Sequence, residues 1–334
     1  MAKRVKKAKD TQFLYISARV RSMESKMLTS DKLERMIDAR TDEDALKVLS
    51  ECGYPEVQDV SGLEKALGAR RAEVFAELAS AKNGAGLVDV FRLKYDCHNM
   101  KTLLKAAQAN VGADLLLSDC GTVDPQTLKN CLIHEEFDEV PGGMGKEFSE
   151  ARDVLTSTGD PQLSDIVLDR ACMERQRELA RLSGSEFLRG YVRLMADCAN
   201  LRSGVRAIRM GKGLDFLEKV LMEGGSVDVK SLSSTLLEGG SLAELFNGGP
   251  LEDAAKMADG LGKDSRFTAF ERECENSLVR YLAAAKMIPF GEQPVVAFAG
   301  AIENEITAVR IIMAGRQSDM APEAIRERLR ETYV

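Results

Sequence analysis

FRLKYDCHNMKTLLKA (residues 91–106) carries a pattern that returns in VRLMADCANLRSGVRA (residues 192–207) and in AFAGAIENEITAVRII (residues 297–312), at intervals of about a hundred residues. When the three stretches are registered on Asn99, Asn200 and Asn304, three basic residues also fall into line. These are Lys105, Arg206 and Arg310. The first two stretches share an Asp-Cys pair as well. Agreement at several separated positions predicts a threefold internal repeat.

Apolar residues recur within each stretch in steps of three and four, which places them on one face of an α-helix. Only Glu305 interrupts this apolar stripe. A repeat of this length exceeds that of short helical-pair solenoids and predicts three domain-sized helical units. We place them at residues 1–118, 119–222 and 223–334. The alternative is that three amphipathic helices align by chance.

The composition favours an all-α fold. The 334 residues include no Trp, only 5% aromatic residues and eight Pro, whereas good helix formers are plentiful. Seven cysteines form no CxxC pair, and their odd number does not suggest a disulfide framework. We therefore expect reduced thiols, with Cys97 and Cys198 packed on the apolar stripe.

The net charge of −7 argues against nucleic-acid binding, because phosphate neutralisation needs a basic surface. A local exception is a basic cluster formed by Lys3, Arg4, Lys6, Lys7 and Lys9. It could touch anionic lipid or an acidic partner, or it is a solvated terminus. No apolar run reaches the roughly 20 residues of a membrane span, and no signal peptide is expected. These features predict a cytoplasmic protein.

Local signals predict where the helices lie. The cluster of Thr29, Ser30 and Asp31 is expected to cap the helix that follows it, Thr41 to cap the next, and Pro125 to open another. Each unit is expected to end with a middle helix, a short break and the long repeat helix. The long helices are placed at 87–111, at 185–210 and up to residue 314, and residues 321–334 are predicted to form a last amphipathic helix.

The sequence contains no recognisable catalytic constellation. His98 and His134 are the only histidines, and Cys131-x-x-His134 lacks the further ligands that a metal site needs. The stretch PGGMGK (residues 141–146) resembles the end of a phosphate-binding loop, but Val140 and Glu147 occupy positions where that loop requires Gly and Ser or Thr. We interpret it as a flexible link. Asp96 and Asp197 lack paired carboxylates. No catalytic residue, cofactor, metal or small-molecule substrate is predicted.

Three parts of the chain together resemble a known family. They are YISARVRSMESKMLTSDKLERMIDARTDEDALKVLSECGY (residues 15–54), the triplicated motif and AIENEITAVRIIMAGRQSDMAPEAIRERLRETYV (residues 301–334). They look like the C subunit of the prokaryotic V-type (A/V-type) rotary ATPase, which is related to the d subunit of the eukaryotic V-ATPase. The likeness spans nearly the whole chain, and the opening YxxARVRxME pattern is its most specific part. Residues 110–190 and 220–265 are less diagnostic.

The resemblance implies three helical domains arranged with pseudo-threefold symmetry into a funnel on the membrane proteolipid ring. The funnel of that family receives the central shaft, made of the D and F subunits, and passes torque without catalytic residues of its own. The chain would then lie at the cytoplasmic face of the membrane. Ion type, the direction of operation and the funnel end that meets the ring stay open.

Five basic residues are candidates for partner binding. Arg19 and Arg21 lie in the opening motif, and Lys105, Arg206 and Arg310 recur once per unit. Our hypothesis is that the recurring three face the pore or bind neighbouring units. The alternative is that they pair with carboxylates of their own unit. A helical scaffold outside the rotary ATPase, and an enzyme with a polar-lined cavity, are the other functional classes considered.

Overall fold

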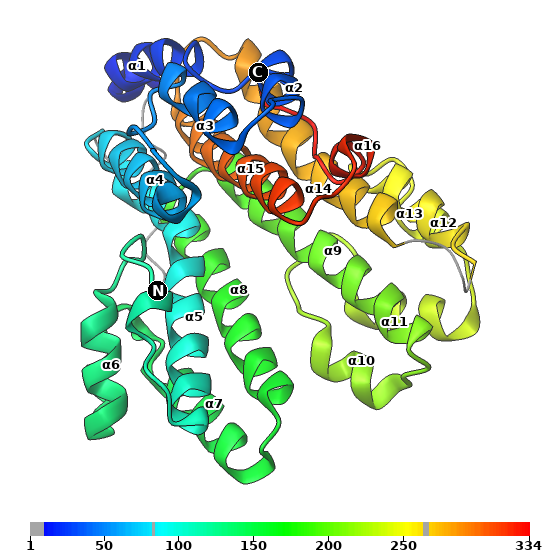
Figure 1. The fold of residues 1–334 in the computed structure, drawn as a ribbon. Helices are drawn as coiled ribbons and strands as arrows, with labels where there is room; N and C mark the ends of the chain where they lie inside the picture. Colours follow the sequence, from blue (N-terminus) through cyan, green and yellow to red (C-terminus); the bar gives the residue numbers. More distant parts are fainter. Residues whose placement is uncertain (1–9, 82–83, 263–266) are drawn as a thin grey trace.

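A computed structural model describes residues 10–81, 84–262 and 267–334 (Figure 1). Within these ranges the regular structure consists of α-helices and short 3-10 helices, without a strand. The predicted all-α class is confirmed. The basic cluster at residues 3–9 lies outside the described residues.

Three helix pairs form the framework. Each pair joins a middle helix to a long helix: α4 (Leu63–Ala79) to α5 (Gly84–Ala109), α8 (Pro161–Ser183) to α9 (Glu186–Arg209), and α14 (Thr268–Ala283) to α15 (Glu292–Gln317). The long helix of each pair also packs on the middle helix of the next: α5 on α8, α9 on α14, and α15 on α4. The six helices therefore make a closed circuit of contacts. A funnel with a pseudo-threefold axis stays a prediction.

Shorter helices cover this framework. They are α1 (Leu14–Glu24), α2 (Ser30–Ile37), α3 (Asp42–Glu51), α6 (Pro125–His134), α7 (Gly145–Thr158), α10 (Leu214–Val220), α11 (Val229–Glu238), α12 (Leu242–Leu245), α13 (Glu252–Asp259) and α16 (Pro322–Arg326). The predicted caps are confirmed, because Thr29 accepts from the Lys32 N–H and Thr41 from the Asp44 N–H. Pro125 occupies the first turn of α6 behind the capping Asp124.

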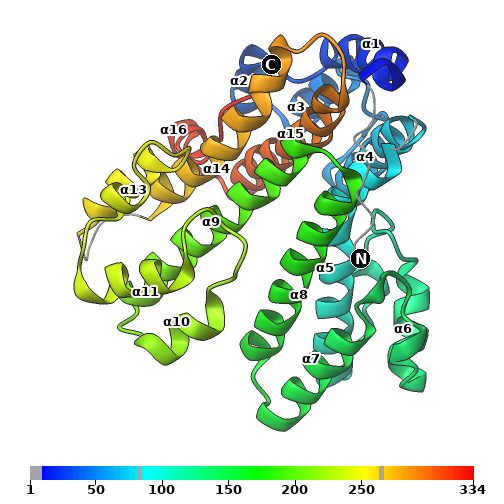
Figure 2. The ribbon, with the colours of Figure 1, turned by 180° about the vertical axis from the view of Figure 1, so that it is seen from behind.

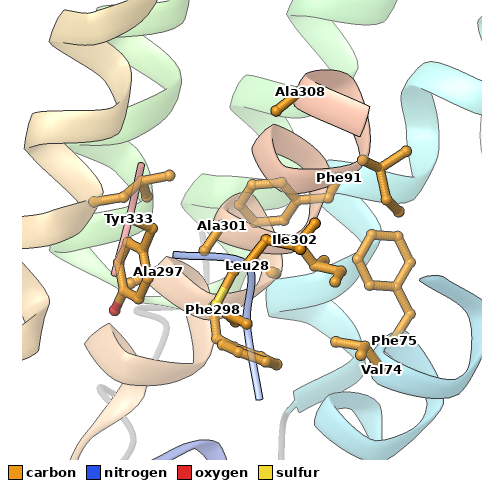
Figure 3. Close-up of a cluster of buried hydrophobic side chains, with 14 of the residues drawn as sticks. Leu28, Val74, Phe75, Phe91, Ala297, Phe298, Ala301, Ile302, Ala308 and Tyr333 are labelled. Carbon is orange, nitrogen blue, oxygen red and sulfur yellow. The ribbon is translucent and has the colours of Figure 1, made fainter. Parts of the chain in front are cut away.

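Two arms extend from a common body (Figures 1 and 2). One arm contains the outer part of α5 with α6, α7 and α8, and the other contains the outer part of α9 with α10 to α14; each has its own apolar core. A third core lies in the body, where α15 packs among α1, α2, α4, α5, α9 and α14. Figure 3 shows part of this core. The predicted unit boundaries near residues 118 and 222 fall between helices and stay predictions.

Small residues bring the helices of the body together. Gly300 on α15 faces the neighbouring side chains so closely that a Cβ there would lie 2.3 Å from Cδ1 of Leu282 and 3.2 Å from Cε1 of Phe91. Contacts below 3.0 Å require the surroundings to move. Gly300 therefore sets how closely α15 approaches α5 and α14.

The prediction of a helix over residues 321–334 is wrong beyond its first turn. Helix α16 ends at Arg326, and the chain then runs without regular structure to Val334. Tertiary contacts outweigh helix propensity here. The Glu331 N–H donates to Asn276 Oδ1 at 2.9 Å, and the buried Tyr333 donates from its hydroxyl to Glu24 at 2.9 Å. The tail thus ties α14 to α1.

The glycine-rich stretch at residues 141–146 forms a compact turn. Pro141–Gly143 is a 3-10 helix in which Gly142 and Gly143 have φ of 82° and 76°. Helix α7 begins two residues later, at Gly145, where a Cβ would lie 1.8 Å from the carbonyl oxygen of Phe137. The glycines therefore serve backbone geometry and close packing, and no strand precedes the turn in the described part of the chain.

Candidate functional site

Two of the three repeat asparagines, Asn99 and Asn200, clamp the chain that follows their long helix. The side chain of Asn99 donates to the Ser118 carbonyl and accepts from the Ser118 N–H, both at 2.8 Å. Asn200 makes the same pair of bonds with Met222, at 2.7 and 2.8 Å. An Asn side chain, with one donor group and one acceptor, can satisfy both backbone groups of a single residue. Asn99 and Asn200 therefore have the same structural role in the two repeats.

The aspartates of the repeat hold the next part of the same loop. Asp96 accepts from the Thr122 and Val123 N–H groups, at 3.1 and 3.0 Å. Asp197 accepts in the same way from Ser226 and Val227, at 2.8 and 3.2 Å. Both carboxylates are buried, so these bonds offset the cost of burying a charge. They are loop anchors and not members of a reactive pair.

A second repeated motif accompanies these anchors. GTVD (residues 121–124) and GSVD (residues 225–228) contain the donors to Asp96 and Asp197. A Cβ at Gly121 or Gly225 would lie 2.1 Å from an oxygen of the respective aspartate, so each glycine permits the close approach. The final aspartate of each motif caps the following helix, α6 or α11. This motif was not predicted from the sequence, although comparing the segments that follow the two long helices would have found it.

The third copy differs from the other two. Ala301 stands at the position of Asp96 and Asp197, so the carboxylate anchor is missing. Asn304 still donates to a downstream carbonyl, that of Glu331 at 2.9 Å, whereas the Glu331 N–H bonds to Asn276. The C-terminal tail therefore takes the place of the clamped loop.

The three recurring basic residues form ion pairs with middle helices. Lys105 on α5 pairs with Asp165 on α8 at 2.6 Å. Arg206 on α9 pairs with Glu271 on α14, and Arg310 on α15 contacts Glu64 on α4 with both nitrogens of one edge, at 2.8 and 2.6 Å. Each pair thus joins a long helix to the middle helix of the next pair. All three basic side chains remain partly exposed and accessible to a partner.

The two arginines of the opening motif have different surroundings. Arg19 is half-exposed and pairs with Glu77 on α4 at 3.0 Å. Arg21 is less exposed and contacts both oxygens of Glu24 at 2.8 Å. It also donates to the carbonyls of Ala285 and Ile288, at 3.1 and 2.6 Å. Arg21 therefore links α1 to the segment between α14 and α15, whereas Arg19 has more of its surface free.

A buried charged cluster joins three helices of the body. Glu303 on α15 accepts from Arg71 on α4 at 2.9 Å, from Lys94 on α5 at 2.7 Å, and from the Tyr95 hydroxyl at 2.8 and 2.7 Å. The guanidinium of Arg71 lies 4.6 Å from the centre of the Tyr95 ring. Burial and the nearby Glu303 carboxylate raise the pKa of Tyr95, so its hydroxyl remains a donor. The cluster holds α4, α5 and α15 in one relative orientation.

Glu305, which interrupts the apolar stripe, is a buried acceptor. It receives the Tyr54 hydroxyl and the Leu28 N–H, both at 2.6 Å. Burial raises the pKa of its carboxyl, while Tyr54, Leu28 and the nearby Arg70 and Lys32 act in the opposite direction with smaller effect. The interruption is therefore a specific link from α15 to the N-terminal helices.

This raised pKa predicts a pH-dependent contribution to stability. The carboxyl of a Glu in the unfolded chain has a pKa of about 4.3. A higher pKa in the folded protein means that the folded form binds the proton more tightly than the unfolded form. The contribution of Glu305 to the free energy of unfolding is fully present below about pH 4.3, and it is lost as the pH rises through the pKa of Glu305 in the folded protein. The free energy of unfolding of wild type relative to Glu305→Gln should therefore fall between about pH 4.5 and about pH 7.5. Urea denaturation at both values tests this, and a constant or growing difference would contradict it.

An open cleft lies between the two arms. It consists of two adjoining hollows of about 710 and 490 Å³. Their shared lining is Ile166, Arg170 and Met173 on α8, with Met222 after α10. Helices α8 and α10 stand on opposite sides of it (Figure 2). Arg202 and Arg206 of α9 line the smaller hollow, and the larger hollow is also lined by the carboxylates of Glu147, Glu150, Glu174 and Glu223. The cleft therefore combines apolar side chains with charges of both signs.

His98 and the seven cysteines lie in surroundings that indicate structural roles. Nε2 of His98 lies 2.9 Å from the Leu116 carbonyl oxygen. All seven cysteines are free thiols and buried. Among the described residues, no group of three His, Cys, Asp or Glu side chains is placed to hold a metal ion. Nor does any described helix have the length and apolar character needed to cross a bilayer.

Known proteins with similar sequences are subunits of ATPases and ATP synthases. A family described as ATP synthase (C/AC39) subunit matches residues 16–328. The chain is 22% identical to the C subunit of the V-type sodium ATPase of Enterococcus hirae over 319 residues, which cover 94% of this chain and 97% of that protein. It is 26% identical to the C subunit of the A-type ATP synthase of Methanocaldococcus jannaschii, over 95% of this chain and 86% of that protein. A third relative, the C subunit of the A-type ATP synthase of Thermococcus kodakarensis, is 24% identical.

Proposed function

Because the chain belongs to the ATP synthase (C/AC39) subunit family, we propose that it is the non-catalytic central-stalk socket of a V/A-type ATPase. Membership makes it a component that works within an ATPase complex. In the finer proposal, it receives the shaft of the D and F subunits, rests on the membrane proteolipid ring at the cytoplasmic face, and transmits torque between them. The family match over residues 16–328 carries this proposal.

The closed circuit of six helices supports a role in transmitting torque. A coupling element must resist twisting, and here each long helix is held by its own middle helix and by that of the next pair. The Glu303 cluster adds a buried link between α4, α5 and α15. Exposed ion pairs such as Lys105–Asp165 add only about 0–1 kcal/mol each, so they serve orientation more than stability.

The cleft between the arms is the surface that we assign to the shaft. Its floor of Ile166, Met173 and Met222 offers apolar contact, and Arg170 and Arg206 offer charge. Arginine and methionine are both enriched in protein interfaces. Arg19, Arg21, Lys105, Arg206 and Arg310 remain proposed partner contacts, and Arg206 is the one that lines this cleft.

Charge reversal in the cleft tests the assignment. We expect Arg170→Glu to weaken binding of the purified D–F complex at least about tenfold, since losing a central arginine often costs more than about 1–2 kcal/mol. Arg181→Glu is the matched control, because Arg181 lies on the same helix, is exposed and does not line the cleft. Equal D–F affinity for the two variants would exclude the cleft as the shaft site.

A charge swap separates internal pairing from partner binding at Arg206. Arg206→Glu alone breaks the pair with Glu271, whereas Arg206→Glu combined with Glu271→Arg restores it in reverse. A contact with the shaft predicts weak D–F binding in both variants. Recovery of D–F binding in the double variant would mean that Arg206 serves only the internal ion pair with Glu271. Charge reversal at Arg206 and Arg310 without loss of folding or shaft binding would exclude both from the shaft surface.

Purification from native membranes tests the socket role as a whole. The tagged chain is isolated after mild solubilisation, before and after the catalytic head is stripped. Proteolipid and the D and F subunits should remain bound in both cases. Their absence, together with a different stable partner, would place the chain outside the central stalk.

A further inference from the structure

Two cysteines from different helices lie side by side in the arm that contains α8. Cys97 lies on α5 and Cys172 on α8, and their thiols are hydrogen-bonded to each other. Both residues belong to the apolar core of this arm, with exposed fractions of 4% and 9%. All seven cysteines of the chain are free thiols, so the pair is a reduced dithiol.

Polar contacts on both sides of the pair fix the register of α5 against α8. On one side, Lys101 pairs with Asp169 at 2.5 Å. On the other side, Gln176 donates to the Val90 carbonyl at 3.0 Å. The two helices therefore run in opposite directions, and the two cysteines fall opposite each other between these contacts. Their thiols meet because the helices are held in this register, and not through a chance orientation of two side chains.

Cys172 can be reached from the cleft. It lines the smaller hollow of about 490 Å³, together with Met173 and Gln176 of the same helix and Arg202 of α9. A hollow of this size admits a small organic molecule. Cys97 does not line the hollow. A reagent that enters the cleft therefore meets Cys172 first.

The environment of Cys97 suits it to react second. Its hydrogen bond with Cys172 and its burial raise the pKa of Cys97, so this thiol keeps its proton. Nearby Lys101 acts in the opposite direction with smaller effect. Modification of Cys172 removes the hydrogen bond, and Cys97 can then lose its proton and act as a nucleophile.

We propose that Cys97 and Cys172 form a reversible dithiol site that is oxidised by small disulfides entering the cleft. The Cys172 thiolate attacks one sulfur of the small disulfide, whose S–S bond breaks and releases one thiolate. Cys97 then attacks the Cys172 sulfur of the mixed disulfide, and the second small thiolate leaves. Two electrons pass from the protein to the small disulfide, and the two thiol protons end on the released thiols. The product is one covalent bond between α5 and α8.

The new bond would change one arm without joining the two arms. It links two helices of that arm and lies within its apolar core. In reducing compartments such disulfides are transient and serve redox sensing. This inference does not rest on the socket role. It adds to the chain a modification site whose state depends on the surrounding small thiols and disulfides.

The second arm supplies a matched control. Cys198 on α9 and Cys274 on α14 are also hydrogen-bonded through their thiols, and the Cys198 sulfur lies 3.5 Å from the Cys274 carbonyl oxygen. Their exposed fractions are 1% and 0%, and neither residue lines the cleft. A reagent can reach this pair only after local opening of the fold. The two pairs thus share the thiol contact but differ in access.

Oxidation of the reduced full chain by glutathione disulfide tests the proposal. Cys97 and Cys172 should appear in one linked peptide when a non-reducing digest is analysed by mass spectrometry, and dithiothreitol should restore both thiols. Cys198 and Cys274 should react at least about tenfold more slowly, because they depend on local opening. Cys97→Ser should stop at the glutathione adduct of Cys172, whereas Cys172→Ser should leave Cys97 unmodified.

Three outcomes would overturn the proposal. They are the absence of the linked peptide, oxidation of Cys198 and Cys274 at the same rate, and an adduct on Cys97 in the Cys172→Ser variant. Circular dichroism verifies that each variant keeps its fold. The comparison of the two pairs uses the wild-type chain alone, so it holds even where a serine variant does not fold. Because no D or F subunit is present, the result is independent of D–F binding.

Discussion

Replacing Glu303 with alanine is expected to lower the free energy of unfolding by about 3–5 kcal/mol, because it leaves a buried cation without its counter-charge. The side chain of Arg71 is 2% exposed and contacts Glu303 at 2.9 Å. The Tyr95 hydroxyl would lose its acceptor at the same time.

The chain offers a matched control for this substitution. Glu64 also pairs with an arginine across α4 and α15, but both Glu64 and Arg310 are well exposed. Glu64→Ala should therefore cost only about 0–1 kcal/mol. Urea denaturation of the two variants gives the comparison. Similar losses would mean that burial does not govern the strength of these pairs.

A double variant checks the cause of the large effect. If the cost of Glu303→Ala comes from the unpaired guanidinium, then Arg71→Met with Glu303→Ala should be less destabilised than the sum of the single changes. A strictly additive result would contradict this explanation.

Phe298→Ala is expected to destabilise the protein by about 3–5 kcal/mol, through lost burial and the cavity that remains. Phe298 lies on α15 and is 0% exposed. It lies in the cluster drawn in Figure 3, with Leu28, Phe75 and Ile302. The members of this cluster come from separate parts of the chain, so the movement of one helix would not fill the space.

Phe290→Ala provides the control for this prediction. Phe290 lies just before the same helix and is 42% exposed. Exposed positions away from special features usually change stability by less than about 0.5 kcal/mol. Thermal and urea denaturation measure both variants. A loss at Phe298 as small as that at Phe290 would show that α15 is not central to the core.

Local patterns predicted most of the helices. The apolar spacing around Asn99, Asn200 and Asn304 places them in long helices, and α5, α9 and α15 occupy those positions. The caps at Thr29 and Thr41 were predictable because a cap joins a side chain to a backbone group three residues away. The helix predicted for residues 321–334 was wrong for the opposite reason, because Tyr333 and Glu331 bond to residues far away in the sequence.

The candidate site was less predictable than the helices. The five basic residues were found by their motif and their recurrence, but nothing in the sequence names their partners. Asp165, Glu271 and Glu64 lie 60, 65 and 246 residues from Lys105, Arg206 and Arg310. The cleft between α8 and α10 depends in the same way on how the arms diverge.

The sequence by itself determined the all-α class, the threefold recurrence and the order of middle and long helices, because helical periodicity and capping act within a few residues. Only the tertiary structure decided that α15 returns to α4, that Glu305 is a buried acceptor and that Glu303 binds Arg71 and Lys94 from two other helices. Such features depend on which distant residues the packing of helices brings together, and burial then decides whether a charge is costly or inconsequential.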